Sequence, residues 1–163
     1  MGTAKGASAR VMVPFRAFLK MKSRRAHIVT LDLSSRFDVL EMVQAVLHHV
    51  AQLVDMNDDA AHDVGVALRE SVVNAIKHGN RCEEHRRVQV EFLVGAGALE
   101  VRVGDEGRGF DPAKVADPVA PENLLKPDGR GIFFMRSFMD EVSYSFPAKG
   151  GTIVSMVKRL PAS

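Results

Sequence analysis

The chain of 163 residues has the length and composition of one soluble globular domain. Hydrophobic residues make up 46% and charged residues 26% of it, an ordinary balance for such a domain. The single cysteine, Cys82, excludes an internal disulfide framework and fits a reducing compartment. No apolar run approaches the roughly 20 residues that a membrane span requires, so we expect no membrane segment.

The net charge of +2 is distributed unevenly along the chain. Residues 1–31 carry seven basic and no acidic side chains, whereas the remainder carries 15 basic and 20 acidic ones. We therefore expect residues 1–26 to form a basic tail outside a mildly acidic domain. The tail is interpreted as a disordered leader, as an electrostatic arm for nucleic acid or anionic lipid, or as a targeting segment. Translation from Met12 or Met21 is a further alternative.

The first predicted elements are a strand and an amphipathic helix. Residues 27–33 alternate and are rich in β-branched side chains, which predicts a strand. Ser35 and Asp38 have the spacing of a capping box, with aspartate in the acidic place. The apolar residues that follow recur every three or four positions and predict a helix from about 36 to 54: Leu40, Val43, Leu47, Val50 and Val54.

A second amphipathic helix is predicted directly after the first. Asn57 and Asp58 are suitable capping residues, and Gly79 with Asn80 ends the helix after about His78. Its apolar face consists of Ala61, Val64, Leu68, Val72 and Ile76.

The second half of the chain changes to the two-residue period of strands. Residues 88–94 and 99–103 alternate, and the Gly95-Ala-Gly97 turn between them predicts a hairpin. Residues 104–131 contain five glycines and four prolines and show no regular element. A loop of that length inside a compact domain is usually functional.

The chain ends with a short helix and a second hairpin. Ile132, Met135 and Met139 indicate the helix, and residues 142–146 and 152–158 form the two strands. Short turns join the paired strands, so the sheet is mainly antiparallel. We therefore predict an α/β fold of the α+β type, a two-layer sandwich with helices on one face, over residues 27–160.

The second helix also carries a polar stripe on the side away from its apolar face. Glu70, Asn74, Lys77 and His78 fall within about 100° of arc at 100° per residue. Asn is a middling helix former, and a carboxylate and an amide one turn apart offer two hard oxygen ligands that suit Mg²⁺. A solvated polar face is the alternative interpretation.

Two glycine-rich segments follow. In the first, Asp105 stands where a strand ends, and Gly107 and Gly109 allow the backbone to approach a ligand closely. In the second, residues 128–132 precede a helix, where free N–H groups form an anion site and Arg130 adds a charged donor fork. Each segment read alone also fits an ordinary turn or a capped helix start.

Taken together and in this order, the three segments resemble the Bergerat ATP-binding fold shared by gyrase, histidine kinases and MutL. Residues 70–79 resemble its N box, residues 105–110 its G1 box and residues 129–132 its G2 box, and Gly151-Thr152 matches the final strand motif. Within that superfamily, the small size of the chain and its E-x-x-x-N-A-x-x-H-G motif resemble the anti-sigma-factor serine/threonine kinases.

The resemblance implies a role for each matching residue. Asp105 would bind the amine of adenine with support from Thr152, Asn74 would hold Mg²⁺, and a lid at about residues 111–128 would close over the phosphates. His78 either contacts the nucleotide or packs at the helix end. The implied ATP-binding residues are Asn74, Lys77, His78, Asp105, Gly107, Gly109, Phe110, Gly129, Arg130, Gly131, Ile132 and Thr152.

Glu70 is the implied catalytic residue, because the acceptor hydroxyl must be aimed and relieved of its proton in phosphoryl transfer. The implied function is that of a cytoplasmic anti-sigma factor that uses ATP and Mg²⁺ to phosphorylate an anti-anti-sigma protein with a STAS-type domain. The alternative is a non-catalytic, ATP-dependent module that sequesters a sigma factor or another partner. Nucleic-acid binding rests only on the basic tail.

Two further expectations concern the helices. The first helix, with His48, His49 and Gln52 beside its apolar stripe, is a candidate surface for a homodimer or a sigma factor. A histidine kinase needs a phosphoacceptor His on a separate helical hairpin. The His62-Asp63 pair falls on the nucleotide-binding helix itself, so we do not expect this chain to be a detached histidine-kinase module.

Overall fold

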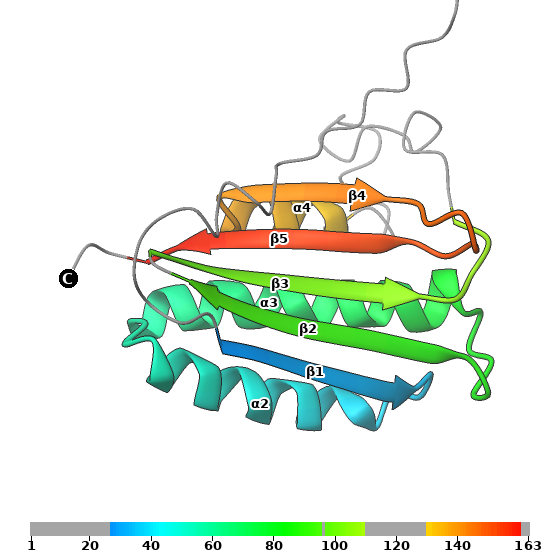
Figure 1. Cartoon of the computed structure of the whole chain (residues 1–163), viewed down its shortest axis with the longest axis horizontal. Coiled ribbons are helices and arrows are strands. Elements are labelled where there is room, and N and C mark those ends of the chain that lie inside the picture. The colour runs from blue at the N-terminus through cyan, green and yellow to red at the C-terminus, as the bar shows by residue number, and fades with distance from the viewer. Residues whose placement is uncertain (1–26, 96, 110–129, 161–163) are drawn as a thin grey trace, which may run out of the picture.

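The computed structural model describes residues 27–95, 97–109 and 130–160, and shows a five-stranded sheet with its helices on one face (Figure 1). The elements are β1 (His27–Ser34), α2 (Val39–Leu53), α3 (Asp58–Asn74), the π-helical turn η1 (Ala75–Gly79), β2 (Arg87–Gly95), β3 (Ala98–Asp105), α4 (Arg130–Phe138), β4 (Glu141–Ser145) and β5 (Ile153–Arg159). None of the helices in these ranges combines the length and hydropathy of a membrane span. The predicted tail over residues 1–26 and most of the predicted lid lie outside the described residues.

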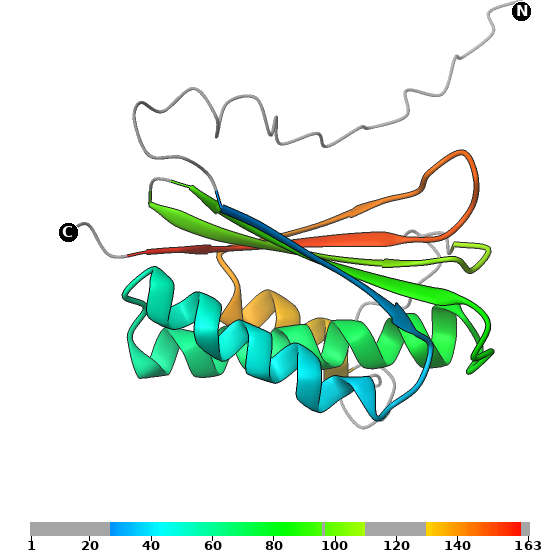
Figure 2. The same ribbon diagram turned by 60° about the horizontal axis from the view of Figure 1, so that its bottom comes forward.

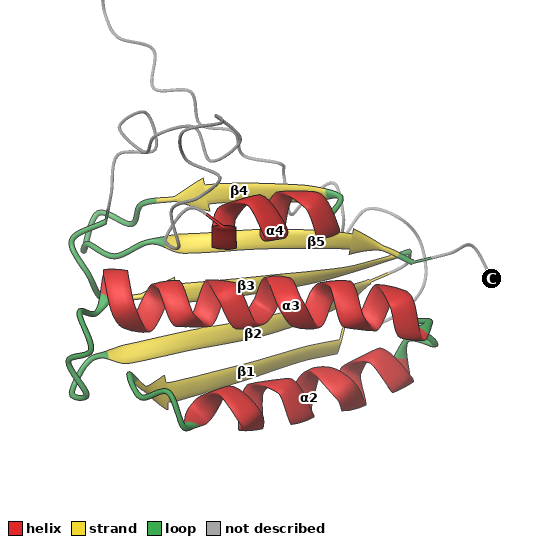
Figure 3. Cartoon of the chain, turned by 180° about the vertical axis from the view of Figure 1, so that it is seen from behind, coloured by secondary structure: helices red, strands yellow, loops and turns green. Residues whose placement is uncertain are grey.

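The sheet order is β1-β2-β3-β5-β4, and every neighbouring pair is antiparallel. The helices α2, α3 and α4 lie beneath this sheet in Figure 2 and in front of it in Figure 3, with α3 between the other two. The predicted two-layer α+β sandwich is therefore confirmed. Both layers contribute to one hydrophobic core, in which Leu68 and Val72 of α3 and Phe92 and Val101 of the central strands are fully buried.

The helix α2 has the predicted buried stripe but not the predicted cap. Leu40, Val43, Leu47 and Val50 are buried, as their spacing predicts. Asp38 stands at the N-cap in a helical conformation and makes no capping hydrogen bond. Its carboxylate instead accepts a hydrogen bond from Arg36 Nη2 at 2.6 Å, and this pairing lowers the pKa of Asp38. The predicted capping box was wrong because the helix begins at Val39, later than the predicted start near residue 36, so Ser35 precedes it and the Ser35 Oγ has no hydrogen-bond partner among the described residues.

The helix α3 begins as predicted. The Asn57 side chain accepts a hydrogen bond from the Ala60 N–H at 2.8 Å, which satisfies one free donor of the first turn. Beyond Asn74 the helix widens into the π-helical turn η1, which the sequence analysis did not predict. Such turns often occur at functional sites.

The boundaries of the predicted central loop are corrected at both ends. The strand β3 extends to Asp105, which pairs with Val88, so Gly104 and Asp105 belong to the sheet. The helix α4 begins at Arg130 rather than near Ile132. Between these elements, residues 110–129 lie outside the described part of the chain.

Candidate functional site

A cavity of about 330 Å³ lies where the C-terminal end of α3, the turn η1 and the helix α4 meet the sheet. Residues of β3, β4 and β5 form its opposite wall. Six of the residues predicted for the site line it: Asn74, His78, Asp105, Gly109, Ile132 and Thr152. The cavity therefore brings together residues from all of the predicted motifs.

Asp105 is fixed at the end of β3 by backbone donors. Its Oδ1 accepts hydrogen bonds from the N–H groups of Gly107, at 2.8 Å, and Thr152, at 3.2 Å. Burial raises the pKa of Asp105, although these two hydrogen bonds and the charge of Arg86 act in the opposite direction. Since both of these bonds go to Oδ1, the second carboxylate oxygen remains an acceptor for a donor in the cavity.

Gly79 lets the helix approach this carboxylate. A Cβ atom on Gly79 would overlap the carboxyl group of Asp105, so no other residue fits here without moving Asp105. The glycine is the last residue of η1, and the π-helical turn is therefore what seats the helix end against β3.

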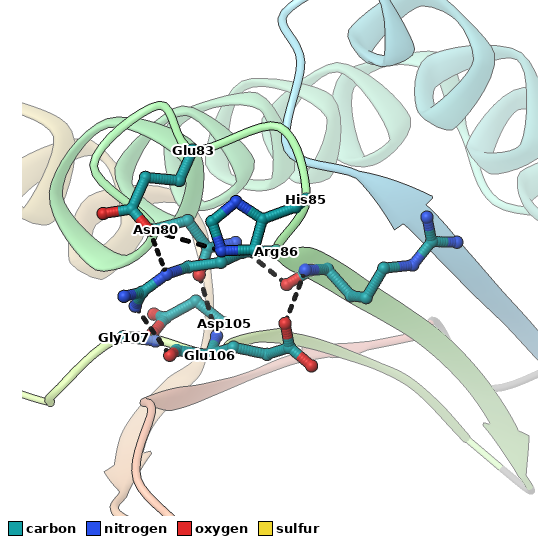
Figure 4. A network of polar contacts seen from close by, with 8 residues as sticks. Asn80, Glu83, His85, Arg86, Asp105, Glu106 and Gly107 are labelled. Carbon is teal, nitrogen blue, oxygen red and sulfur yellow. Dashed lines mark hydrogen bonds and ion pairs between the residues drawn. The ribbon is translucent and has the colours of Figure 1, made fainter.

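A polar network behind Asp105 holds this part of the backbone in place (Figure 4). Asn80 is fully buried: its Nδ2 donates to the Arg87 carbonyl and its Oδ1 accepts from the Glu106 N–H, both at 2.9 Å. Arg86 donates from Nε to Glu83 at 2.7 Å and from Nη1 to the Glu106 carbonyl at 2.9 Å. Both the N–H and the carbonyl group of Glu106, the residue after Asp105, are thus hydrogen-bonded.

The polar stripe of α3 meets the start of α4. Gly131 is buried against it, and a Cβ atom on Gly131 would lie 2.8 Å from Glu70 Oε2 and 3.4 Å from Asn74 Nδ2. The two side chains predicted for catalysis and Mg²⁺ binding therefore lie beside the first turn of α4. A carboxylate and an amide oxygen are hard donors, and this pair fits the few protein ligands that Mg²⁺ takes alongside phosphate oxygens.

The remaining predicted residues are placed as follows. Lys77 and His78 are both exposed in η1, and His78 lines the cavity. Arg130 is exposed as the first residue of α4. Phe110 and Gly129 lie outside the described residues. His62 is on α3 itself, as expected, and the neighbouring Asp63 accepts from Lys158 Nζ at 3.0 Å.

Two arginines at the cavity were missed by the sequence analysis. Arg81 and Arg108 are exposed and line it, which adds positive charge suited to an anionic ligand. Arg108 lies between Gly107 and Gly109, so its place within the glycine-rich segment could have indicated that it lies at the site. Arg81 has a positive φ of 56° in the turn after η1, a conformation that no sequence pattern signals here.

Comparisons with known proteins give a family and several relatives for this chain. The family model of the histidine kinase-like ATPase domain matches residues 33–158. A serine-protein kinase RsbW of Listeria monocytogenes serovar 1/2a is 27% identical over 136 residues, covering 80% of this chain and 85% of that protein. RsbW of Bacillus licheniformis is 28% identical over 143 residues (84% and 88%). RsbW of Bacillus velezensis is 33% identical over 125 residues (73% and 77%).

Solved structures share the fold. The RsbU and RsbW domains of a Mycobacterium tuberculosis protein superpose with a TM-score of 0.61 at 19% identity, covering 82% of this chain. The match spans 32% of that longer chain. The histidine kinase domain of a blue-light activated histidine kinase from Erythrobacter litoralis gives 0.50 at 19% identity, covering 76% of this chain and 60% of that one.

Proposed function

Because the chain belongs to the histidine kinase-like ATPase family, we propose that it is an ATP-dependent serine/threonine protein kinase that acts as an anti-sigma factor. The observation that carries this proposal is the arrangement of Glu70 and Asn74 against Gly131, beside a cavity in which Asp105 is fixed. The serine-protein kinases RsbW, which match most of the chain, support the same activity.

Asp105 recognises the base. With Oδ1 occupied by the N–H groups of Gly107 and Thr152, Oδ2 accepts the exocyclic amine of adenine. Guanine presents a carbonyl oxygen at the same place, which would face the carboxylate with no proton between them. The site therefore selects ATP over GTP.

The phosphates extend toward the start of α4 and the polar stripe of α3. Free N–H groups in the first turn of α4 and the guanidinium of Arg130 bind phosphate oxygens, and Lys77 adds a cation. Asn74 would hold Mg²⁺, which when bound would neutralise part of the negative charge of the phosphates.

Glu70 performs the proton transfer. Its carboxylate lies one helical turn before Asn74, so it is placed to orient the Ser or Thr hydroxyl of a protein substrate at the γ-phosphate. Glu70 accepts the hydroxyl proton as the oxygen–phosphorus bond forms and ADP leaves. General-base catalysis of this kind contributes about 10²- to 10⁴-fold in rate.

The protein partners follow from the same proposal. The phosphoacceptor is an anti-anti-sigma protein with a STAS-type domain, and the sequestered partner is a cytoplasmic sigma factor. The helix α2 exposes Met42 and Leu53, with 55% and 74% of their surfaces accessible. Docking or dimerisation on this helix stays a prediction.

A phosphotransfer assay tests the proposed function. The purified chain is incubated with Mg-ATP radiolabelled on the γ-phosphate and with the STAS-domain proteins of the same cell. Wild type should label a Ser or Thr of one of them, whereas Glu70→Gln should bind ATP and label it about 10²- to 10⁴-fold more slowly. Nucleotide binding by wild type without transfer to any of these proteins would favour the non-catalytic binding module instead.

A further inference from the structure

Ser71 is a buried hydroxyl that the fold itself does not use. It lies in α3 directly after Glu70, with 1% of its surface accessible. Its Oγ has no hydrogen-bond partner within the described part of the chain. Buried polar groups in folded proteins are nearly always paired, so a hydroxyl left in this state requires an explanation.

The position of Ser71 supplies one. Ser71 lines the same cavity as Asp105. It lies one helical turn before Ala75 and two turns before Gly79, the residue that contacts the carboxyl group of Asp105. Among the described residues that line the cavity, Ser71 and Thr152 are the polar side chains with less than a tenth of their surface accessible.

The surroundings of Ser71 are otherwise apolar. The cavity wall includes Val103 and Met135, each 1% exposed, and Val154, which is 9% exposed. An aromatic base fits between such walls, but the nitrogens on its edge lose water when they enter and need partners in return. A hydroxyl can donate to them, whereas the carboxylate of Asp105 can only accept.

We propose that Ser71 Oγ donates a hydrogen bond, directly or through one water molecule, to a ring nitrogen beside the amine of the bound adenine. The two candidate acceptors are N1, which is bonded to the carbon that carries the amine, and N7, which lies on the other side of the amine. Asp105 then reads the donor of the adenine edge and Ser71 reads the neighbouring acceptor. This inference rests on the proposed ATP-binding function and adds a specificity-determining residue to it.

Ser35 offers a matched control. It is also a buried serine, 2% exposed, with an Oγ that has no partner among the described residues, but it does not line the cavity. Replacing the hydroxymethyl side chain of serine by the methyl of alanine removes a buried hydroxyl that makes no hydrogen bond, so neither Ser71→Ala nor Ser35→Ala should destabilise the nucleotide-free protein. In α3, alanine is also the stronger helix former.

The test measures the affinity of the full chain for ADP, 1-deaza-ADP and 7-deaza-ADP by isothermal titration calorimetry. Ser71→Ala should bind ADP about two- to tenfold more weakly than wild type, while Ser35→Ala should match wild type. Wild type should bind one of the two deaza analogues more weakly than ADP, by a factor similar to the effect of Ser71→Ala on ADP binding. Ser71→Ala should bind that analogue no more weakly than it binds ADP, as in a double-mutant cycle.

Equal ADP affinities of wild type and Ser71→Ala would overturn the inference and leave the proposed function standing. The same conclusion follows if each deaza analogue loses the same factor in affinity relative to ADP with wild type as with Ser71→Ala. If wild type binds no ADP at all, the proposed function fails, and this inference fails with it.

Discussion

Replacement of Asp105 by asparagine changes one atom of the proposed adenine contact. The asparagine Oδ1 can still accept the hydrogen bonds from the N–H groups of Gly107 and Thr152, so the side chain keeps its orientation. The group that faces the cavity becomes an NH₂ donor instead of a carboxylate oxygen. The exocyclic amine of adenine would then meet another donor.

The expected loss of affinity is large. A hydrogen bond to a charged group contributes about 1.5–3 kcal/mol, and leaving a buried donor unpaired costs about 1–3 kcal/mol more. At 1.4 kcal/mol for each factor of ten, Asp105→Asn should weaken ADP binding by roughly 10²- to 10⁴-fold. Discrimination against GDP should shrink, because the guanine oxygen can accept from the new NH₂ group.

The same substitution should not destabilise the protein without nucleotide. Burial raises the pKa of Asp105, so the folded state disfavours the charged form. The carboxyl group's contribution to stability is then greatest at low pH and declines as pH rises through its folded pKa. Near neutral pH, asparagine removes this cost, and the melting temperature of Asp105→Asn should equal or exceed that of wild type.

Calorimetric titration with ADP and GDP, together with thermal unfolding in the absence of nucleotide, checks both statements. Asp59→Asn is the matched control, because Asp59 is exposed in the first turn of α3 and does not line the cavity. The proposed contact between Asp105 and the adenine amine is refuted if Asp105→Asn binds ADP within threefold of wild type. It is also refuted if the loss of binding is explained by a protein that unfolds at a much lower temperature.

Three further substitutions and a pH titration test other parts of the proposed site. Glu70→Gln should lower phosphotransfer by about 10²- to 10⁴-fold while ADP affinity, measured calorimetrically, changes less than threefold; parallel losses of both would argue against a catalytic role. Gly131→Ala should slow phosphotransfer at a nearly unchanged melting temperature, since its Cβ displaces the flexible Glu70 carboxylate; normal transfer rates would count against that contact. Asn80→Ala should lower the free energy of unfolding in urea by about 2–4 kcal/mol, because the Arg87 carbonyl and the Glu106 N–H lose their buried partner; a loss below 0.5 kcal/mol would contradict the network. ADP affinity should fall as pH is lowered toward the raised pKa of Asp105, a dependence that Asp105→Asn should lack.

The fold could be predicted where local periodicity and burial agree. The alternating residues of β2 and β3 and the three- and four-residue spacing in α2 and α3 each correspond to a buried face. The Asn57 cap was predictable for the same reason, since a cap depends on residues only three positions away. These features need no knowledge of distant parts of the chain.

The errors arose where a competing partner decides the structure. Ser35 and Asp38 had the spacing of a capping box, but the helix begins only at Val39, and the Asp38 carboxylate pairs with Arg36 instead. The π-helical turn η1 exists where the helix end must reach Asp105, which is distant in sequence. No local pattern records such a requirement.

The candidate site, like the fold, could be predicted from the sequence only in part. Its motif residues, such as Asn74, Asp105 and Gly131, stand out because glycines and a mid-helix asparagine are unusual where they occur. Ser71 and Asn80 carry no such signal, since a serine in a helix and an asparagine after a glycine are common. Only the three-dimensional structure shows that one lines the cavity and that the other supports Asp105.

Transfer of phosphate to a STAS-domain protein separates the proposed kinase from a non-catalytic ATP-binding module. Wild type and Glu70→Gln would be incubated with radiolabelled Mg-ATP and the STAS-domain proteins of the same cell, and the labelled residue would be located by mass spectrometry. We expect one phosphorylated Ser or Thr with wild type and labelling at least about a hundredfold slower with Glu70→Gln, although both bind ATP. Equal labelling by the two proteins, or ATP binding by wild type with no labelled residue, would contradict it.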